Sequence, residues 1–236
     1  MAKTVLVTRP RPGAAGTADR LRKLGHVPLV LPLTRIVAVP PVPPEGPFDA
    51  VAITSANALR QAPPAFLRPW LDLPCLAVGE ATAQAAGKAG FRHVVAGGGD
   101  GTALARTLGA SLKAHARVLY LTGRIRSPGF EQAVTQAGRG IVPAVVYDTV
   151  PLDYPDGELV TFFGSEPVSA CLLYSRFGAR GFRQLTERGS VHHLFEKTEV
   201  LCLSAPISEI FDDGKPRLVR VAVKPDEAAL LDLLRD

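Results

Sequence analysis

Hydroxyl-bearing residues, glycines and one arginine stand where short apolar runs of this 236-residue chain end. If such runs form parallel strands, their carboxyl ends meet at one edge of the sheet, beside the amino ends of helices. Backbone N–H groups at helix starts bind carboxylates, and a guanidinium would add a charged contact. The pattern therefore predicts a receptor for carboxylates at the residues that follow the runs, which are Thr8, Arg9, Ser55, Gly79, Gly123, Ser175 and Ser204.

The same residues also have a purely structural interpretation. A Ser or Thr side chain directly before a helix commonly accepts a hydrogen bond from a backbone N–H group of the first turn. Each hydroxyl in the set could act only as such a cap, and Arg9 could be an ordinary surface charge.

Several other kinds of catalytic and metal site are missing from the sequence. It contains no Ser–His–Asp arrangement, no Walker loop and no G-x-G-x-x-G after the first apolar run. Three cysteines (Cys75, Cys171 and Cys202), none in a C-x-x-C pair, argue against disulfides and zinc, and we expect buried, inert thiols at Cys171 and Cys202, which lie in apolar runs. The pair His192-His193 has no third ligand at metal spacing and predicts a solvated loop.

The glycine-rich run Gly97–Thr102 resembles the phosphate loop of the NAD kinase and diacylglycerol kinase families. Those kinases follow the loop with an Asn-Glu element, whereas Asn57, the single asparagine of this chain, lies upstream of it. We therefore expect a flexible turn in which Asp100 or Thr102 caps the next helix.

Composition narrows the class of protein. Apolar residues make up 47% and charged residues 21%, a globular balance, and the net charge of +5 suits a small anionic substrate. The basic residues are spread along the chain rather than clustered, which gives nucleic-acid binding little support. No apolar stretch approaches the ~20 residues that span a membrane, and Met1–Val7 lacks the features of a signal peptide. We expect a cytoplasmic protein.

Apolar runs alternate with segments of helical periodicity along the chain. Val5–Thr8 is followed by Ala18, Leu21 and Leu24 at helical spacing, and Gly25 is placed to end that helix. Continuous apolar strands alternating with amphipathic helices predict an α/β fold whose parallel sheets are covered on both faces. The stretch Glu158–Val168 fits the pattern poorly and has no assignment. Later strands are expected in 27–33, 50–54, 76–78, 94–96, 118–121, 141–146, 170–174, 200–203 and 219–223.

An internal repeat predicts the domain organisation. Three strand–turn–helix units recur in one order, so that Ile53–Leu59, for example, matches Leu173–Ala179. A fourth unit is out of order, because Leu6–Arg9 opens the chain whereas its counterpart Tyr120–Gly123 follows its three units. The simplest arrangement inserts one flavodoxin-like domain (41–142) into another (1–33 and 152–236), with a two-stranded linker (34–40 and 143–151). Two short linkers would form a hinge beside a ligand-binding cleft. The alternative is a tandem split near residue 116.

The ordered motifs resemble those of the uroporphyrinogen-III synthase family over nearly the whole chain. Each motif is weak alone, but their order and spacing together are fairly specific. They are V-T-R-P (Val7–Pro10), T-S-x-N-A (Thr54–Ala58), V-G-x-x-T-A (Val78–Ala83), L-Y-L-x-G (Leu119–Gly123), Y-x-T (Tyr147–Thr149) and a last strand end that bears Ser204. The family fold, two α/β domains joined by a two-stranded linker, agrees with the permuted repeat.

The resemblance implies an enzyme, a lyase of haem, cobalamin or chlorophyll biosynthesis. Its reaction would cyclise the linear tetrapyrrole hydroxymethylbilane to uroporphyrinogen III, with inversion of ring D and loss of water. The implied path runs through an azafulvene and a spiro intermediate in the interdomain cleft. No metal or organic cofactor is implied. We expect a monomer that makes at most transient contact with the preceding enzyme, hydroxymethylbilane synthase, and binds neither nucleic acid nor membrane.

The resemblance also implies roles for individual residues. Tyr147 matches the family's linker tyrosine and would be the proton donor, unless it is only an exposed strand residue beside Val145 and Val146. Thr82 would hold the substrate or its leaving hydroxyl, or else cap a helix, and Arg9 would pair with a carboxylate of the substrate. The last motif, Leu203–Ser208, departs from the family pattern, which puts contacts at that end in doubt. The full expected binding set is Thr8, Arg9, Ser55, Asn57, Gly79, Thr82, Gly123, Ser175 and Ser204.

A non-catalytic protein with the same two lobes is the alternative function. It would close around a small polyanionic ligand and use the same helix ends. Binding of the tetrapyrrole without turnover would favour this interpretation over the enzyme.

Overall fold

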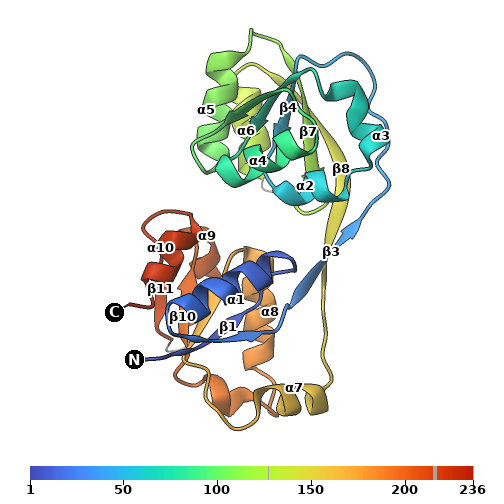
Figure 1. Ribbon diagram of the computed structural model, residues 1–236. Coiled ribbons are helices and arrows are strands. Elements are labelled where there is room, and N and C mark those ends of the chain that lie inside the picture. Colours follow the sequence, from blue (N-terminus) through green and yellow to red (C-terminus); the bar gives the residue numbers. More distant parts are fainter. Residues whose placement is uncertain (127, 215–216, 236) are drawn as a thin grey trace. The chain divides into compact units, whose positions relative to one another are not determined.

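The computed structural model describes residues 1–126, 128–214 and 217–235. The chain divides into two compact units, one formed by Met1–Arg35 with Val150–Asp236 and the other by Ile36–Thr149. Each unit contains one sheet with helices packed on both faces (Figure 1). This confirms the predicted α/β class with two mainly parallel sheets. None of the helices in the described ranges is long and apolar enough to cross a membrane.

The first unit has a five-stranded parallel sheet in the order β11-β10-β9-β1-β2. Its strands are β1 (Thr4–Val7), β2 (Val27–Val30), β9 (Ala170–Leu173), β10 (Glu199–Cys202) and β11 (Val219–Val221). One face is covered by α1 (Gly13–Lys23) and α10 (Glu227–Asp232). The other face is covered by α7 (Asp156–Phe163), α8 (Arg176–Thr186), α9 (Ala205–Ser208) and the 3₁₀ turns η2 (His192–Phe195) and η3 (Glu209–Phe211).

The second unit has a six-stranded sheet in the order β3-β8-β7-β4-β5-β6. Its strands are β3 (Thr34–Ala38), β4 (Ala50–Ile53), β5 (Pro74–Ala77), β6 (His93–Ala96), β7 (Arg117–Gly123) and β8 (Gly140–Pro151). One face is covered by α2 (Ala56–Gln61), α3 (Pro64–Leu67), η1 (Arg68–Trp70) and α4 (Glu80–Lys88). The opposite face is covered by α5 (Gly101–Ser111) and α6 (Pro128–Gln136).

The two sheets share one topology with a permuted chain order. In the first unit β1 lies between β2 and β9, and β10 and β11 follow outward. In the second unit β7 lies between β8 and β4, and β5 and β6 follow outward. The flavodoxin-like order 2-1-3-4-5 therefore occurs twice, but the two strands that open the first unit close the second. This is the out-of-order unit that the repeat predicted.

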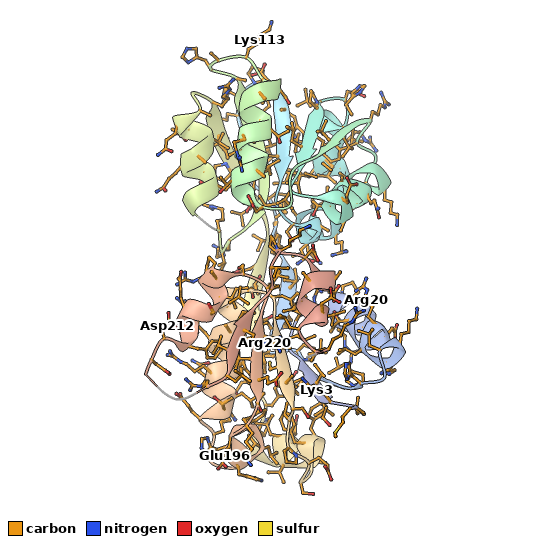
Figure 2. All side chains as sticks on the ribbon, turned by 90° about the vertical axis from the view of Figure 1, so that its left-hand side faces the viewer. Lys3, Arg20, Lys113, Glu196, Asp212 and Arg220 are labelled. Atoms are coloured by element: carbon orange, nitrogen blue, oxygen red, sulfur yellow. The ribbon has the colours of Figure 1, made fainter. Side chains whose placement is uncertain are left out.

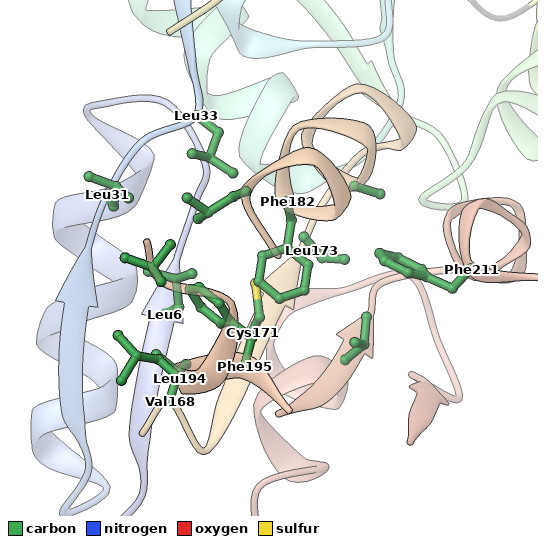
Figure 3. Close-up of a cluster of buried hydrophobic side chains, with 14 of the residues drawn as sticks. Leu6, Leu31, Leu33, Val168, Cys171, Leu173, Phe182, Leu194, Phe195 and Phe211 are labelled. Atoms are coloured by element: carbon green, nitrogen blue, oxygen red, sulfur yellow. The ribbon is translucent and has the colours of Figure 1, made fainter. Parts of the chain in front are cut away.

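The central strands are buried on both faces because helices cover both sides of each sheet. All residues of β4 are fully buried, and in β1 the side chains alternate between the two layers. Val5 and Val7 contact α1 and α10, whereas Leu6 belongs to the cluster around α8, in which Cys171 and Phe182 also lie (Figure 3). The three cysteines are free and buried, and the sequence predicted this burial for Cys171 and Cys202.

Charged side chains are spread over the surfaces of both units, in line with the dispersed basic residues of the sequence. Lys113, Glu196 and Asp212 are examples from separate elements, and all are exposed (Figure 2). None of them lies among the apolar residues of the cores.

The chain passes between the units twice, at residues 35–36 in β3 and at residues 149–150 in β8. Val39 donates its N–H to the Val146 carbonyl, and Leu152 donates to the Leu33 carbonyl. Residue numbers rise in one segment as they fall in the other, so β3 and β8 pair antiparallel. Pro151 ends β8, and a proline cannot donate to a further ladder bond.

Two segments differ from the sequence-based expectation. The unassigned stretch Glu158–Val168 contains most of α7, which starts after Pro155 and ends at Gly164, a residue with φ of +60°. The exposed pair His192-His193 lies in η2 rather than in an irregular loop, because the buried neighbours Val191 and Leu194 anchor the turn.

Candidate active site

The carboxyl edge of the second sheet brings together four of the residues predicted from the sequence. Ile53 of β4 pairs with Leu121 of β7 and with Ala77 of β5. Ser55, Gly123 and Gly79 each lie two residues beyond one of these paired positions. On the other side of β7, Gly123 pairs with Tyr147 of β8. Since β4, β5, β7 and β8 run parallel, Tyr147, Gly123, Ser55 and Gly79 follow one another along the same edge.

A β-bulge directs the Tyr147 side chain to this edge. Thr122 pairs with Val145 but Gly123 pairs with Tyr147, so Val146 is the extra residue. In a regular strand Val146 and Tyr147 would point to opposite faces. Here both contact the buried cluster that α2, α3 and α4 cover, and Tyr147 is half-buried rather than exposed. The bulge therefore turns the phenol ring toward the helix layer that Ser55 begins.

The Tyr147 ring lies against the Gly123 backbone and its hydroxyl meets Ser55. A Cβ atom placed on Gly123 would stand 2.6 Å from ring atoms Cε2 and Cζ and 3.0 Å from the hydroxyl oxygen. The Tyr147 hydroxyl forms a side-chain hydrogen bond with Ser55. Ser55 also accepts a hydrogen bond from the Asn57 backbone N–H at 3.2 Å, which makes it the cap of α2.

The environment keeps the Tyr147 phenol protonated. Burial raises the pKa of Tyr147 above its ordinary value of 10.0, and the nearby Tyr120 phenol raises this pKa further, while the hydrogen bond with Ser55 lowers it. At neutral pH the group is a neutral hydroxyl that can donate a hydrogen bond or a proton. Because Ser55 favours the ionised form, it would also stabilise a phenolate formed during proton transfer.

A second pair of hydroxyls lies beside this site and was missed by the sequence interpretation. The Tyr120 hydroxyl lies 2.7 Å from Oγ1 of Thr54, the residue before Ser55. Tyr120 is almost fully buried and its ring packs edge-on against Phe130. The sequence signal was a tyrosine within the apolar run Leu119–Leu121, because a buried tyrosine hydroxyl generally needs a hydrogen-bond partner.

Helix starts supply the anion-binding groups of this edge. Gly79 precedes α4 and brings no side chain to cap it, so the first amides of α4 receive no side-chain acceptor. Thr82 lies buried in the first turn of α4. Gly99 approaches Gly79 and donates its N–H to the Val78 carbonyl at 2.8 Å. Such uncapped amides attract carboxylates.

Two further predicted features of the second unit have local roles. Asp100 caps α5 by accepting a hydrogen bond from the Ala103 N–H at 2.8 Å, one of the two capping alternatives for the glycine-rich run. The Asn57 side chain accepts a hydrogen bond from Arg60 at 3.0 Å. Asn57 thus contributes its backbone amide to Ser55, and its side chain faces the helix surface.

In the first unit, three predicted residues lie at the carboxyl ends of their strands. Thr8 is buried and donates a hydrogen bond to the Leu172 carbonyl at 3.3 Å. Ser175 caps α8 by accepting from the Gly178 N–H at 3.1 Å. Ser204 precedes α9 and makes no side-chain cap, which leaves its hydroxyl better placed for a ligand than that of Ser175.

Arg9 is engaged within a polar cluster that we call the Glu227 cluster: Arg9, Thr17, Arg20, Tyr174 and Glu227. The Arg9 guanidinium lies 3.3 Å from Glu227 and stacks 4.1 Å from the centre of the Tyr174 ring. Its side chain is 29% exposed. Burial and the Glu227 carboxylate raise the pKa of Tyr174, whose hydroxyl donates to Glu227. Arg9 therefore has a structural task in holding α10 against α1 and β9.

Metal ligands form no comparable group. Throughout the described part of the chain, no cluster of three or more His, Cys, Asp or Glu side chains could hold a metal ion.

Comparisons with known proteins identify similar chains. A family model described as uroporphyrinogen-III synthase HemD matches residues 15–232. The crystal structure of uroporphyrinogen-III synthetase from Helicobacter pylori is similar over 100% of this chain and 99% of its own, with a TM-score of 0.69 and 20% identity. A mutant uroporphyrinogen III synthase from the extremely thermophilic bacterium Thermus thermophilus is similar over 99% and 98%, with a TM-score of 0.57 and 18% identity. No curated protein sequence matches the chain.

Proposed function

The chain belongs to the uroporphyrinogen-III synthase family of enzymes, and from this premise we propose that it cyclises hydroxymethylbilane to uroporphyrinogen III. Ring D is inverted and water is lost in this reaction. The observation that carries the proposal is the Tyr147 hydroxyl, half-buried at the carboxyl edge of the second sheet and kept protonated by burial.

In the proposed mechanism Tyr147 assists departure of the substrate hydroxyl. The pyrrole nitrogen pushes electrons toward the terminal carbon, the C–O bond breaks, and the leaving oxygen takes a proton from the phenol to become water. The resulting azafulvene is attacked by the substituted carbon of ring D to form a spiro intermediate. This intermediate fragments and recloses, and the proton released when the last ring regains aromaticity returns to the phenolate. The Ser55 hydrogen bond stabilises the phenolate in the interval.

Substrate binding is assigned to helix starts in both units. The eight carboxylates of the tetrapyrrole suit a chain with net charge +5 and several uncapped or weakly capped helix amides. We assign binding to Gly79 and Thr82 in the second unit and to Ser204 in the first. Asn57 and Ser175 are weaker members, because the Asn57 amide and the Ser175 hydroxyl already take part in helix caps. Arg9 and Thr8 are weaker members of the set, because both already have partners within the fold.

An isomer assay tests the proposal. Purified protein is mixed with hydroxymethylbilane generated in place, and the oxidised products are separated chromatographically into isomers I and III. Predominant isomer III without added metal or nucleotide is the expected result. Isomer I alone, as in the control without protein, would overturn the proposal, and tight binding without turnover would favour a two-lobed binding protein.

Tyr147→Phe tests the proton donor within the same assay. The variant is expected to form isomer III more slowly without losing it, because the substrate supplies its own electron push and water can replace a weakly acidic phenol. Full activity of this variant would remove Tyr147 from the mechanism.

The proposal also covers the location, the oligomeric state and the partner of the enzyme. We propose that the enzyme acts in the cytoplasm as a monomer and receives its unstable substrate through transient contact with hydroxymethylbilane synthase. A faster overall yield of isomer III when the two enzymes are mixed than when substrate is added to this enzyme alone would support the contact.

A further inference from the structure

We propose that Gly123 is a positioning residue for Tyr147, whose ring occupies the space that any side chain at residue 123 would fill. The inference deepens the proposed function, since it rests on Tyr147 acting in the reaction. Gly123 is the last residue of β7 and is buried. Its backbone provides the surface on which the catalytic ring lies.

The contact distances carry the inference. An added Cβ would lie 2.6 Å from Cε2 and Cζ of Tyr147, whereas carbon atoms normally approach no closer than about 3.5–4.0 Å. The ring would therefore have to move by about 1 Å. The three nearest atoms all belong to the end of the Tyr147 side chain, so we expect an alanine to displace the ring and leave the sheet in place.

The backbone beneath the ring is held on both sides of this contact. The register pairs Gly123 with Tyr147, and Arg124 donates its N–H to the Tyr147 carbonyl at 2.9 Å. The bulge at Val146 has already turned the ring toward the α2 layer. Because these backbone contacts hold the strands together, we expect the Tyr147 ring to move rather than the sheet.

A displacement of the Tyr147 ring by about 1 Å would affect the interaction of its hydroxyl with Ser55. A hydrogen bond between two hydroxyl groups depends steeply on distance, so such a movement weakens the interaction of the Tyr147 phenol with Ser55. Ser55 keeps its other role, because its oxygen still accepts the Asn57 N–H and caps α2. Gly123 thus controls the position of the phenol through the space that it leaves for the ring.

The test compares Gly123→Ala with Gly140→Ala in the isomer assay. Gly140 pairs with Arg117 at the other end of the same two strands, and a Cβ there meets its nearest atom at an ordinary 3.7 Å. We expect Gly123→Ala to lower kcat about tenfold or more with little change in KM, and Gly140→Ala to stay near wild type. Equal kcat values for the two variants would overturn the inference.

A double-variant cycle separates positioning from a general structural effect. If Gly123 acts through the Tyr147 hydroxyl, adding Gly123→Ala to Tyr147→Phe lowers kcat no further. Independent, multiplicative losses would contradict the inference. Should Gly123→Ala fail to fold, removing the ring with Tyr147→Ala is expected to restore folding, and no restoration would also contradict it.

A spectroscopic measurement keeps this inference apart from the proposed function. In protein labelled with carbon-13 at tyrosine Cζ, the Tyr147 resonance is assigned by its loss in Tyr147→Phe. We expect it to shift in Gly123→Ala and not in Gly140→Ala. If the wild type makes only isomer I, the proposed function fails, while the resonance still decides whether Gly123 positions the ring.

Discussion

Replacing Glu227 by glutamine should destabilise the first unit substantially. The Glu227 carboxylate accepts hydrogen bonds from the hydroxyls of Tyr174 and Thr17 and from the guanidiniums of Arg9 and Arg20. Its side chain is 21% exposed, and Thr17 is fully buried. A glutamine keeps one carbonyl oxygen for the hydroxyls but removes the negative charge that pairs with both guanidiniums.

The magnitude follows from the exposure of the two arginines. A hydrogen bond to a charged group contributes about 1.5–3 kcal/mol, and this range applies to Arg9 with its 29% exposed side chain. The Arg20 side chain is 56% exposed and lies on the surface of α1 (Figure 2), so its share is within about 1 kcal/mol. The sum is about 1.5–4 kcal/mol, which lowers Tm by about 3–16 °C.

Glu209→Gln is the matched control for this measurement. Glu209 also stands in the first turn of a short helical segment and pairs with one arginine, Arg176, but both side chains are more than half exposed. Its loss should change stability by at most about 1 kcal/mol. Thermal unfolding followed by circular dichroism gives both values. Equal shifts in Tm would refute the argument that the Glu227 cluster holds α10 in place.

Three further outcomes are expected. Burial and the Lys3 charge lower the pKa of His26, whose Nδ1 accepts a hydrogen bond from the Lys3 backbone N–H. The free energy of unfolding is therefore highest above pH 6.5 and falls as the pH drops below it. The difference between the urea midpoints at pH 8 and pH 5 should be smaller in His26→Gln than in the wild type. Burial raises the pKa of Cys75 and Cys202 to about 12, so mass spectrometry should detect iodoacetamide adducts at pH 8 only after unfolding. Asp100→Ala should cost about 1 kcal/mol in urea unfolding, and more than Asp100→Asn, which retains a cap acceptor.

The fold class was predictable because burial on both faces leaves a direct trace in the sequence. A strand such as Ala50–Ile53 is fully buried, so every residue in it is apolar, and the run is visible without any structure. The permuted repeat was equally visible, because similar strand–turn–helix units, such as Ile53–Leu59 and Leu173–Ala179, recur along the chain. By contrast, α7 is an eight-residue helix with adjacent apolar residues at Leu159-Val160 and Phe162-Phe163, which masks helical periodicity.

The arrangement at Tyr147 was predictable only in part. The tyrosine and glycine were named from motifs, but the regular alternation of a strand would place Tyr147 opposite Val146. The bulge that overrides this alternation has no distinctive residue, since it falls within Val145-Val146-Tyr147. In the same way, nothing in the sequence near Arg9 indicates Glu227, which lies at the far end of the chain and meets it only through packing of α10.

The permuted topology has a consequence for biosynthesis on the ribosome. β1, the strand between β2 and β9, is translated before the second unit, but β9 emerges only after the whole of Ile36–Thr149. The second unit is continuous in the chain and its sheet can form as soon as it has been synthesised. During that time the apolar residues of β1 have only β2 and α1 to cover them. The first strand of this unit is thus among the last to be enclosed, and a nascent chain that has released only the second unit would carry one finished unit and one aggregation-prone fragment.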